Sequence, residues 1–317
     1  MTYARPYFSD DTESLPRIPA WVTSGRAETL ETVAFRSGAA LTVLDQLVSN
    51  AQYGVPLKLL ANRLALSAAT ATSKLEGRLT RETDIRDAYH LTPPDEVRGP
   101  DGDLLAFWRN AVRLRAGGTG EIADLIGVDF AGAMGGWLDT GLELARTHGP
   151  LSGCVAILRA VLDADDRAER VACLLSDIVM ARALGWKTVL LISAQFLAKA
   201  ALRDLAADGQ GAELEVQVPI LESIEETVRM ARELSRRGGA LRAVAPKLRA
   251  KGSDAAVDLF LTEDAVAPSS MLSPCIRGTS IPMTDRAARR FCDRLVELGV
   301  ARELTGRPTF RLYGIAP

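Results

Sequence analysis

Apolar residues that recur every three and four positions constrain the fold of this chain more than any other feature. The spacing predicts helices over residues 27–50 and 56–76, the second with a buried stripe at Leu57, Leu60, Leu64 and Leu66. Alanine, leucine and arginine dominate, and aromatic residues make up only 5% of the sequence. This composition favours helices packed through small residues over a β-sandwich. We therefore expect a mostly α-helical protein with a bundle-like body.

Proline and glycine divide the chain into three expected parts. A polar, proline-bearing start predicts a flexible arm over residues 1–24, followed by a helical domain over 25–240 and a smaller domain over 241–317. Two or three helices are expected over 121–183. Their close backbone approach would occur at Gly132, Gly135 and Gly136.

Local sequence patterns indicate the secondary structure of two later segments of the body. The stretch 186–203 holds the apolar run Val189–Ile192, which fits either a buried strand or a continuing helix. A long helix is expected over 223–237, ended by Gly238 and Gly239, because glycine commonly follows a helix C-terminus.

The last part of the chain has the pattern of a winged-helix-like domain with a small β-hairpin wing. Thr284 suits the N-cap of an amphipathic helix that Gly299 ends. Strands are then expected over 300–305 and 309–313, around a turn at Gly306-Arg307-Pro308. Prolines at 268, 274 and 282 leave room for only a short or irregular helix before Thr284.

Double-stranded DNA is the partner that this pattern favours. Early residues of a recognition helix contact the major groove, and a wing contacts phosphate. The candidate DNA-binding residues are Arg286, Arg289, Arg290, Arg307 and Arg311. The alternative is a domain that only docks a protein or forms a homodimer, and Asp293 and Glu297 would repel phosphate.

The charge distribution fits a basic tail on an acidic body. Residues 235–317 hold 14 Lys and Arg against 8 Asp and Glu, a net charge of +6, and the net charge of the whole chain is −2. The first 234 residues therefore carry −8. This is expected if only the tail contacts nucleic acid, although an arginine-rich helix face paired with the acidic body would give the same numbers.

Several classes of chemistry find no support in the sequence. Only two histidines are present and the four cysteines are widely spaced, so neither a metal site nor a cofactor is expected, and Cys154, Cys173 and Cys292 fit core positions. The glycines at 117–120 lack the context of a phosphate-binding loop. No signal peptide or membrane span is expected, which favours a cytoplasmic protein, and no catalytic residues are identified.

The chain resembles a bacterial family known as domain of unknown function 1403. The likeness is strongest in LRAVAPKLRA (241–250), DLFLTEDAV (258–266) and the long motif that spans 283–315, and weaker likeness covers most of the chain. This resemblance implies an architecture but carries no assigned activity.

A second resemblance concerns Fic-type nucleotidyltransferases. Thr72, Glu76 and Gly77 are similar to their inhibitory helix motif, in which the glutamate pairs with an active-site arginine, and RELTGR (302–307) is similar to the hairpin of their relatives. The active Fic motif needs a histidine followed by a glycine- and asparagine-rich loop, and neither His90 nor His148 has one. The resemblance thus implies a catalytically inactive scaffold that serves protein interaction.

Overall fold

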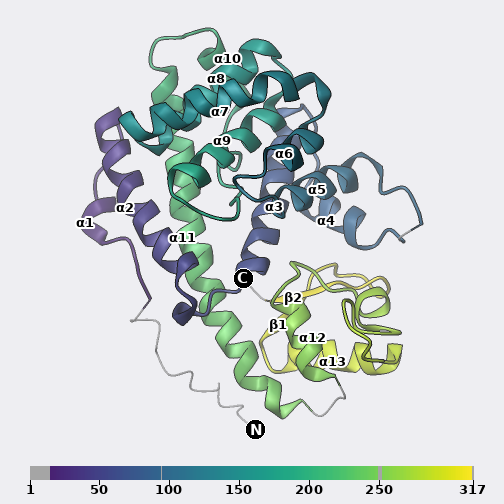
Figure 1. The fold of residues 1–317 in the computed structure, drawn as a ribbon. Coiled ribbons are helices and arrows are strands. Elements are labelled where there is room, and N and C mark those ends of the chain that lie inside the picture. The colour runs from purple at the N-terminus through teal and green to yellow at the C-terminus, as the bar shows by residue number, and fades with distance from the viewer. Residues whose placement is uncertain (1–14, 94, 249–251, 316–317) are drawn as a thin grey trace. The chain divides into compact units, whose positions relative to one another are not determined.

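Helices dominate the computed structural model, which describes residues 15–93, 95–248 and 252–315 (Figure 1). The mostly α-helical fold with a small C-terminal hairpin is confirmed. Of the predicted arm, residues 1–14 lie outside the described residues, and α1 (Ala20–Thr23) is a short helix within the remainder. None of the helices in the described ranges is both long and apolar enough to cross a membrane.

The chain divides into two compact units. Unit 1 comprises residues 43–60 and 228–317 with the described residues up to 17, and unit 2 comprises 18–42 and 61–227. Three helices contribute residues to both units: α2 (Leu30–Ser49), α3 (Leu57–Leu75) and α11 (Ala212–Val244). The domain boundary expected after residue 240 stays a prediction.

Unit 2 is built from helices that follow α3 in quick succession. They are α4 (Glu82–His90), α5 (Gly99–Ala111), α6 (Thr119–Ile126), α7 (Val128–His148), α8 (Pro150–Ala164), α9 (Glu169–Ala183) and α10 (Lys199–Ala206). The prediction of two or three helices over 121–183 is wrong, because α6, α7, α8 and α9 fill this stretch. The breaks that separate them are short and include Gly127 and Gly149, both at positive φ.

Helices α7 and α8 approach closely at a pair of glycines. A Cβ on Gly153 would lie 2.5 Å from the carbonyl oxygen of Gly141, and a Cβ on Gly141 would lie 2.8 Å from Ile157 Cδ1. The prediction that Gly132, Gly135 and Gly136 allow the close approach is wrong, because a Cβ on any of them meets nothing within 4 Å.

The apolar run Val189–Ile192, which precedes α10, forms neither a β-strand nor a helix. The amide of Ile192, the last residue of the run, and the amide of the following Ser193 donate to Asp177 Oδ1 at 3.1 and 2.9 Å, and the hydroxyl of Ser193 donates to the same oxygen at 2.6 Å. A buried carboxylate thus satisfies backbone groups that a strand would pair with a neighbouring strand.

Helix α11 is longer than predicted in both directions. It begins at Ala212, contains Pro219, and continues through Gly238 and Gly239. A Cβ on Gly238 would lie 3.3 Å from Leu261 Cδ2, so the glycine allows close packing inside unit 1. The predicted start at residue 223 and the predicted end at these glycines are therefore wrong.

The C-terminal part of unit 1 combines short helices with a hairpin. Its elements are η3 (Ala245–Lys247), α12 (Ser253–Phe260), the helical turn η4 (Pro268–Leu272), α13 (Asp285–Glu297), β1 (Ala301–Glu303) and β2 (Tyr313–Ile315). The expectation of a short helix before Thr284 is confirmed by η4. The returning strand, predicted over 309–313, forms instead at β2.

Strand β2 lies between two partners. On one side it pairs antiparallel with β1, with Tyr313 opposite Glu303. On the other side Tyr313 forms an antiparallel bridge with Val266, through backbone hydrogen bonds of 2.7 and 2.9 Å. A Cβ on Gly314 would lie 2.8 Å from the carbonyl oxygen of Asp264, which explains glycine in this strand.

The cysteines occupy the positions that their apolar surroundings predicted. Cys154, Cys173 and Cys292 are buried, and Cys275 is exposed. Burial raises the pKa of Cys154 to about 12 and raises that of Cys173. The three buried thiols therefore act as apolar core groups.

Candidate functional site

Helix α13 presents one apolar and one basic face. Thr284 Oγ1 accepts a hydrogen bond from the amide of Ala287 at 3.3 Å, which confirms Thr284 as the N-cap. The apolar positions of the helix are buried in unit 1: Ala288, Phe291, Cys292 and Leu295. All three helix arginines predicted to bind DNA lie on the exposed side.

Three arginines of α13 form a stripe along the helix. Arg286, Arg290 and Arg294 follow one another at intervals of four residues, which places them on one face, and we call them the arginine stripe. They line a pocket of about 650 Å³ together with Lys247, Leu248, Thr284, Ala287 and Phe291. These lining residues include no carboxylate, so the pocket is cationic.

Two of the helix arginines are neutralised by carboxylates of the same helix. Arg289 pairs with Asp285 at 2.9 Å, and Arg294 pairs with Glu297 at 2.8 Å. Glu297, which the sequence suggested would repel phosphate, is thus engaged by a cation. Both pairs are exposed, so they contribute little to stability.

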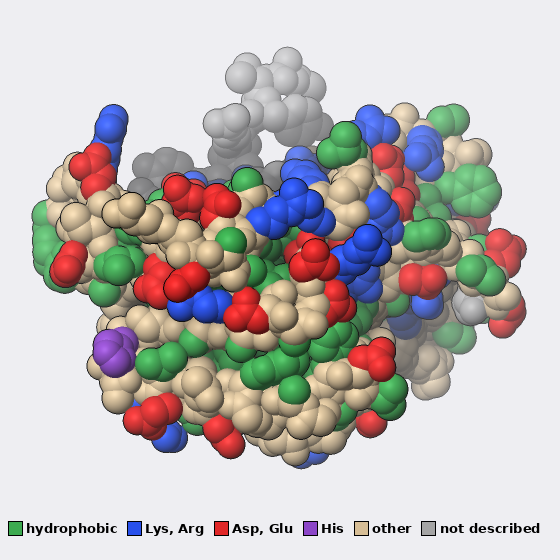
Figure 2. Space-filling view, turned by 90° about the horizontal axis from the view of Figure 1, so that it is seen from above, with side chains coloured by type: hydrophobic (Ala, Val, Ile, Leu, Met, Phe, Trp, Pro, Cys, Tyr) green, Lys and Arg blue, Asp and Glu red, His purple; other side chains and the backbone are tan. Residues whose placement is uncertain are grey.

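The remaining cations of the pocket have no such neighbour. In the ranges that the structure describes, no Asp or Glu lies within ion-pair distance of Arg286, Arg290 or Lys247. On the face shown in Figure 2, by contrast, acidic and basic side chains are interspersed. Three cations that share one pocket without a counter-charge give the pocket a positive electrostatic potential.

The hairpin loop is held in shape at its start by Glu303. Its carboxylate accepts hydrogen bonds from the amide of Thr305 at 2.7 Å, from the Thr305 hydroxyl, and from the amide of Gly306 at 2.8 Å. Partial burial by itself would raise the pKa of Glu303. The hydrogen bonds act in the opposite direction and outweigh the effect of burial, so the pKa is lowered overall. The carboxylate therefore stays ionised and fixes the turn.

The hairpin is also tied to α13 and to itself. The Tyr313 hydroxyl donates to Asp293 Oδ1 at 3.1 Å, and Arg311 Nε donates to the carbonyl oxygen of Arg307 at 3.1 Å. Hydrogen bonding to Tyr313 raises the pKa of Arg311. Asp293, the second suspected repulsive residue, is thus used to position the hairpin, and Arg311 braces the loop from within.

The pocket contains two residues that were not among the predicted DNA-binding residues, and it leaves out others that were. Arg294 and Lys247 join Arg286 and Arg290 at the pocket, while Arg289 does not line it. The spacing of four from Arg290 could have identified Arg294 in the sequence. No local signal could have identified Lys247, because it belongs to the separate turn η3.

The residues of the Fic-like motif occupy the end of α3 in unit 2. Thr72 is buried, and its hydroxyl accepts a hydrogen bond from Trp108 Nε1 at 2.9 Å. Glu76 Oε1 accepts from Arg170 Nη2 at 2.5 Å and from Arg170 Nε at 2.8 Å, and its Oε2 accepts from Arg78 at 2.9 Å. Gly77 follows at a φ of +81° and ends the helix.

The residues around Glu76 and Arg170 form a charged cluster at the start of α9. The Arg170 guanidinium lies 5.2 Å from the centre of the Phe107 ring. Lys199 pairs with the buried Glu169 at 2.7 Å and donates to the carbonyl oxygen of Leu75 at 2.8 Å. Glu169 and Lys199 line a pocket of about 300 Å³, but Glu76 and Arg170 are not among its lining residues.

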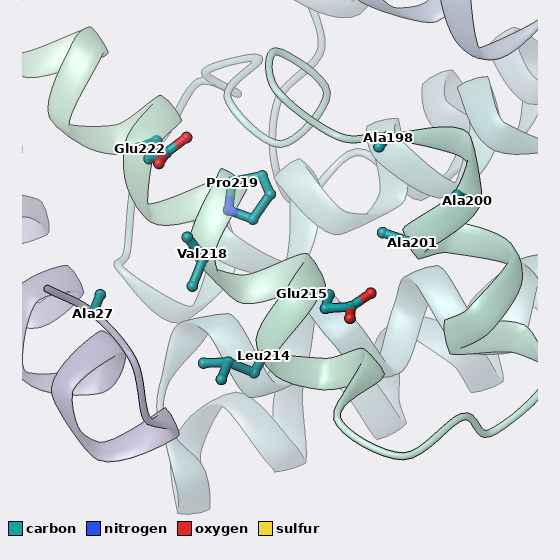
Figure 3. Close-up of a pocket in the computed structure, with 9 residues that line it drawn as sticks. All are labelled: Ala27, Ala198, Ala200, Ala201, Leu214, Glu215, Val218, Pro219 and Glu222. Carbon is teal, nitrogen blue, oxygen red and sulfur yellow. The ribbon is translucent and has the colours of Figure 1, made fainter.

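Another pocket of unit 2 is mainly apolar. Its volume is about 500 Å³. Figure 3 shows its lining residues on the first half of α11, at the start of α10 and at Ala27. Among its nine lining residues, Glu215 and Glu222 are the only charged ones, and both come from α11. The seven other lining residues are apolar.

A family model described as protein of unknown function (DUF1403) matches residues 6–315, which is nearly the whole chain. No curated protein and no solved structure matches the chain.

Proposed function

The chain belongs to the DUF1403 family, described only as of unknown function, and we propose that it binds duplex DNA through α13 and the hairpin that follows. The observation that supports this proposal is the order and pairing of the C-terminal elements. Helix α12, the bridging residue Val266, the turn η4, helix α13 and strands β1 and β2 follow one another, with β2 between β1 and Val266. This order and pairing resemble those of a winged helix, and in our proposal α13 takes the place of the recognition helix.

The chemistry of the exposed face fits this role. At a rise of about 1.5 Å per residue the arginine stripe is about 12 Å long, close to the width of the major groove of about 12 Å. Arginine can bind guanine through two hydrogen bonds, and arginine and lysine bind phosphate. Among the residues that the structure describes, Arg286, Arg290 and Lys247 have no carboxylate to release before they bind.

The test compares two arginine variants of the same helix. We expect Arg286→Ala combined with Arg290→Ala to weaken binding to a fluorescent random duplex at least tenfold at low salt, because phosphate contacts of this kind supply essentially all of the affinity for DNA of random sequence. Arg289→Ala is the matched control, because Asp285 already pairs with this arginine. Its affinity should stay within about threefold of the wild type. Equal affinities for the double variant and the wild type would remove α13 from the proposal.

The contact between Glu76 and Arg170 favours a second candidate function. A glutamate that follows Thr72 by four residues and pairs with an arginine is what the likeness to Fic inhibitory helices implies. We infer that unit 2 is a Fic-related scaffold without transferase activity, kept as a module for protein interaction.

Labelled ATP tests the absence of transferase activity. Glu76→Gln would free Arg170 from its counter-charge while keeping the size of the side chain. We expect neither the wild type nor this variant to transfer label from ATP labelled at the α-phosphate to itself or to added protein. Transfer by the variant alone would identify a repressed enzyme instead of an inactive scaffold.

A further inference from the structure

The tip of the hairpin holds an apolar side chain that the fold of unit 1 leaves uncovered. Phe310 is 71% exposed and its backbone lies at a φ of +54°. A bulky residue is rarely found in this left-handed region, and such a conformation costs about 1–3 kcal/mol. Neither core packing nor backbone preference therefore explains why this position carries a phenylalanine.

The loop around Phe310 is built to hold it outward. Its base is closed by the hydrogen bond from the amide of Leu304 to the carbonyl oxygen of Leu312, at 2.8 Å. Glu303 fixes the ascending side of the turn, and the hydrogen bond from Arg311 to Arg307 spans Phe310 itself. The exposed ring is thus carried on a braced turn.

The charge around the ring limits what it can contact. Residues 304–312 contain Arg307 and Arg311 and no Asp or Glu, and Arg302 is exposed on β1. A flat apolar ring flanked by cations complements a partner that is anionic at its rim and apolar between. Duplex DNA has this character in its minor groove, where phosphates border the stacked base steps and inserted arginine side chains are attracted.

We propose that Phe310 is a wedge that inserts into the minor groove next to the major groove occupied by α13, with Arg307 on the flanking backbone. This inference rests on the proposed function. The bond between Tyr313 and Asp293 holds the hairpin at the side of α13, so both elements can meet one duplex. A side chain that inserts between base steps partly unstacks them and changes the twist of the duplex.

The test measures DNA twist, because such a readout does not require knowledge of the binding site. Relaxed plasmid is treated with topoisomerase in the presence of increasing protein, and the linking number is compared at matched occupancy. We expect the wild type to shift the linking number in proportion to the protein bound. Phe310→Ala should remove most of this shift and weaken binding about tenfold, by analogy with aromatic stacking on bases.

The controls separate failure of this inference from failure of the proposed function. Leu79→Ala removes an apolar side chain that is 91% exposed in unit 2, and should leave both the shift and the affinity unchanged. A wild type that binds duplex in the anisotropy assay but gives a shift equal to that of Phe310→Ala would overturn the wedge alone. A wild type that binds no duplex at low salt would overturn the DNA-binding proposal, and the wedge with it.

Discussion

Asp177 on α9 is a buried carboxylate whose protonation should affect the stability of the fold. It is 1% exposed, and one of its oxygens accepts all three hydrogen bonds from Ile192 and Ser193. Burial raises its pKa to about 7, although these hydrogen bonds oppose the shift. The pKa in the unfolded chain is about 3.9, so the folded state binds the proton more tightly.

We therefore predict that Asp177→Asn flattens the pH dependence of stability. The contribution of the Asp177 proton is fully present below about pH 4 and is lost as the pH rises through 7. Between pH 5 and 8 the unfolding free energy of the wild type should fall by about 2–3 kcal/mol more than that of the variant. Urea unfolding followed by circular dichroism measures this difference, with Asp163→Asn, an exposed position, as the control. If the unfolding free energies of all three proteins depended on pH in the same way, the raised pKa of Asp177 would be refuted.

Single residues could be predicted from the sequence only where their role is local. Arg286 and Arg290 lie opposite the apolar stripe of one amphipathic helix, so the spacing alone placed them on the exposed face. Lys247 reaches the same pocket from another turn, and Arg170 lies 94 positions from Glu76. Partners of this kind are brought together by tertiary structure, and no periodicity within one element indicates them.

At the scale of elements, the crossing of α7 and α8 depends on glycine. A Cβ on Gly153 would meet the carbonyl oxygen of Gly141 at 2.5 Å and Ala145 Cβ at 2.7 Å. We predict that Gly153→Ala destabilises the protein by about 1–3 kcal/mol, because the two helices must move apart. Thermal unfolding followed by circular dichroism measures the change.

Gly132 provides the matched control for this prediction. It lies inside the same α7, and a Cβ there meets nothing within 4 Å. Gly132→Ala should therefore stabilise the protein by about 0.5–1 kcal/mol, as alanine does in an open helix position. Equal effects of the two substitutions would show that the crossing is not tight.

Elements were predictable where local pattern and tertiary packing agree. The helices expected over 27–50 and 56–76 formed as α2 and α3, and α13 formed from its cap onward. Helix α11 passed through Pro219 and two glycines because its packing outweighs their poor helix propensity. The apolar run that ends at Ile192 formed no strand, because the carboxylate of Asp177 accepts hydrogen bonds from the backbone amides of Ile192 and Ser193.

At the scale of the whole molecule, the net positive charge and the candidate DNA-binding elements lie in the same part of the sequence. The net charge of +6 over residues 235–317 belongs to the part of unit 1 that holds the arginine stripe and the hairpin. The first 234 residues carry −8. A uniformly basic protein would bind polyanions through any surface, whereas this distribution confines the attraction to one part of the chain. Binding should therefore involve few phosphates.

The salt dependence of binding tests this account most directly. We predict that the affinity for random duplex DNA, measured by fluorescence anisotropy over a range of salt concentrations, falls with a logarithmic slope of about 3–5, as expected for three to five phosphate contacts. The variant with alanine at both Arg286 and Arg290 should lose about 2 from this slope, and Arg289→Ala should keep it. Binding that is absent at low salt, or whose slope is the same in all three proteins, would contradict the account.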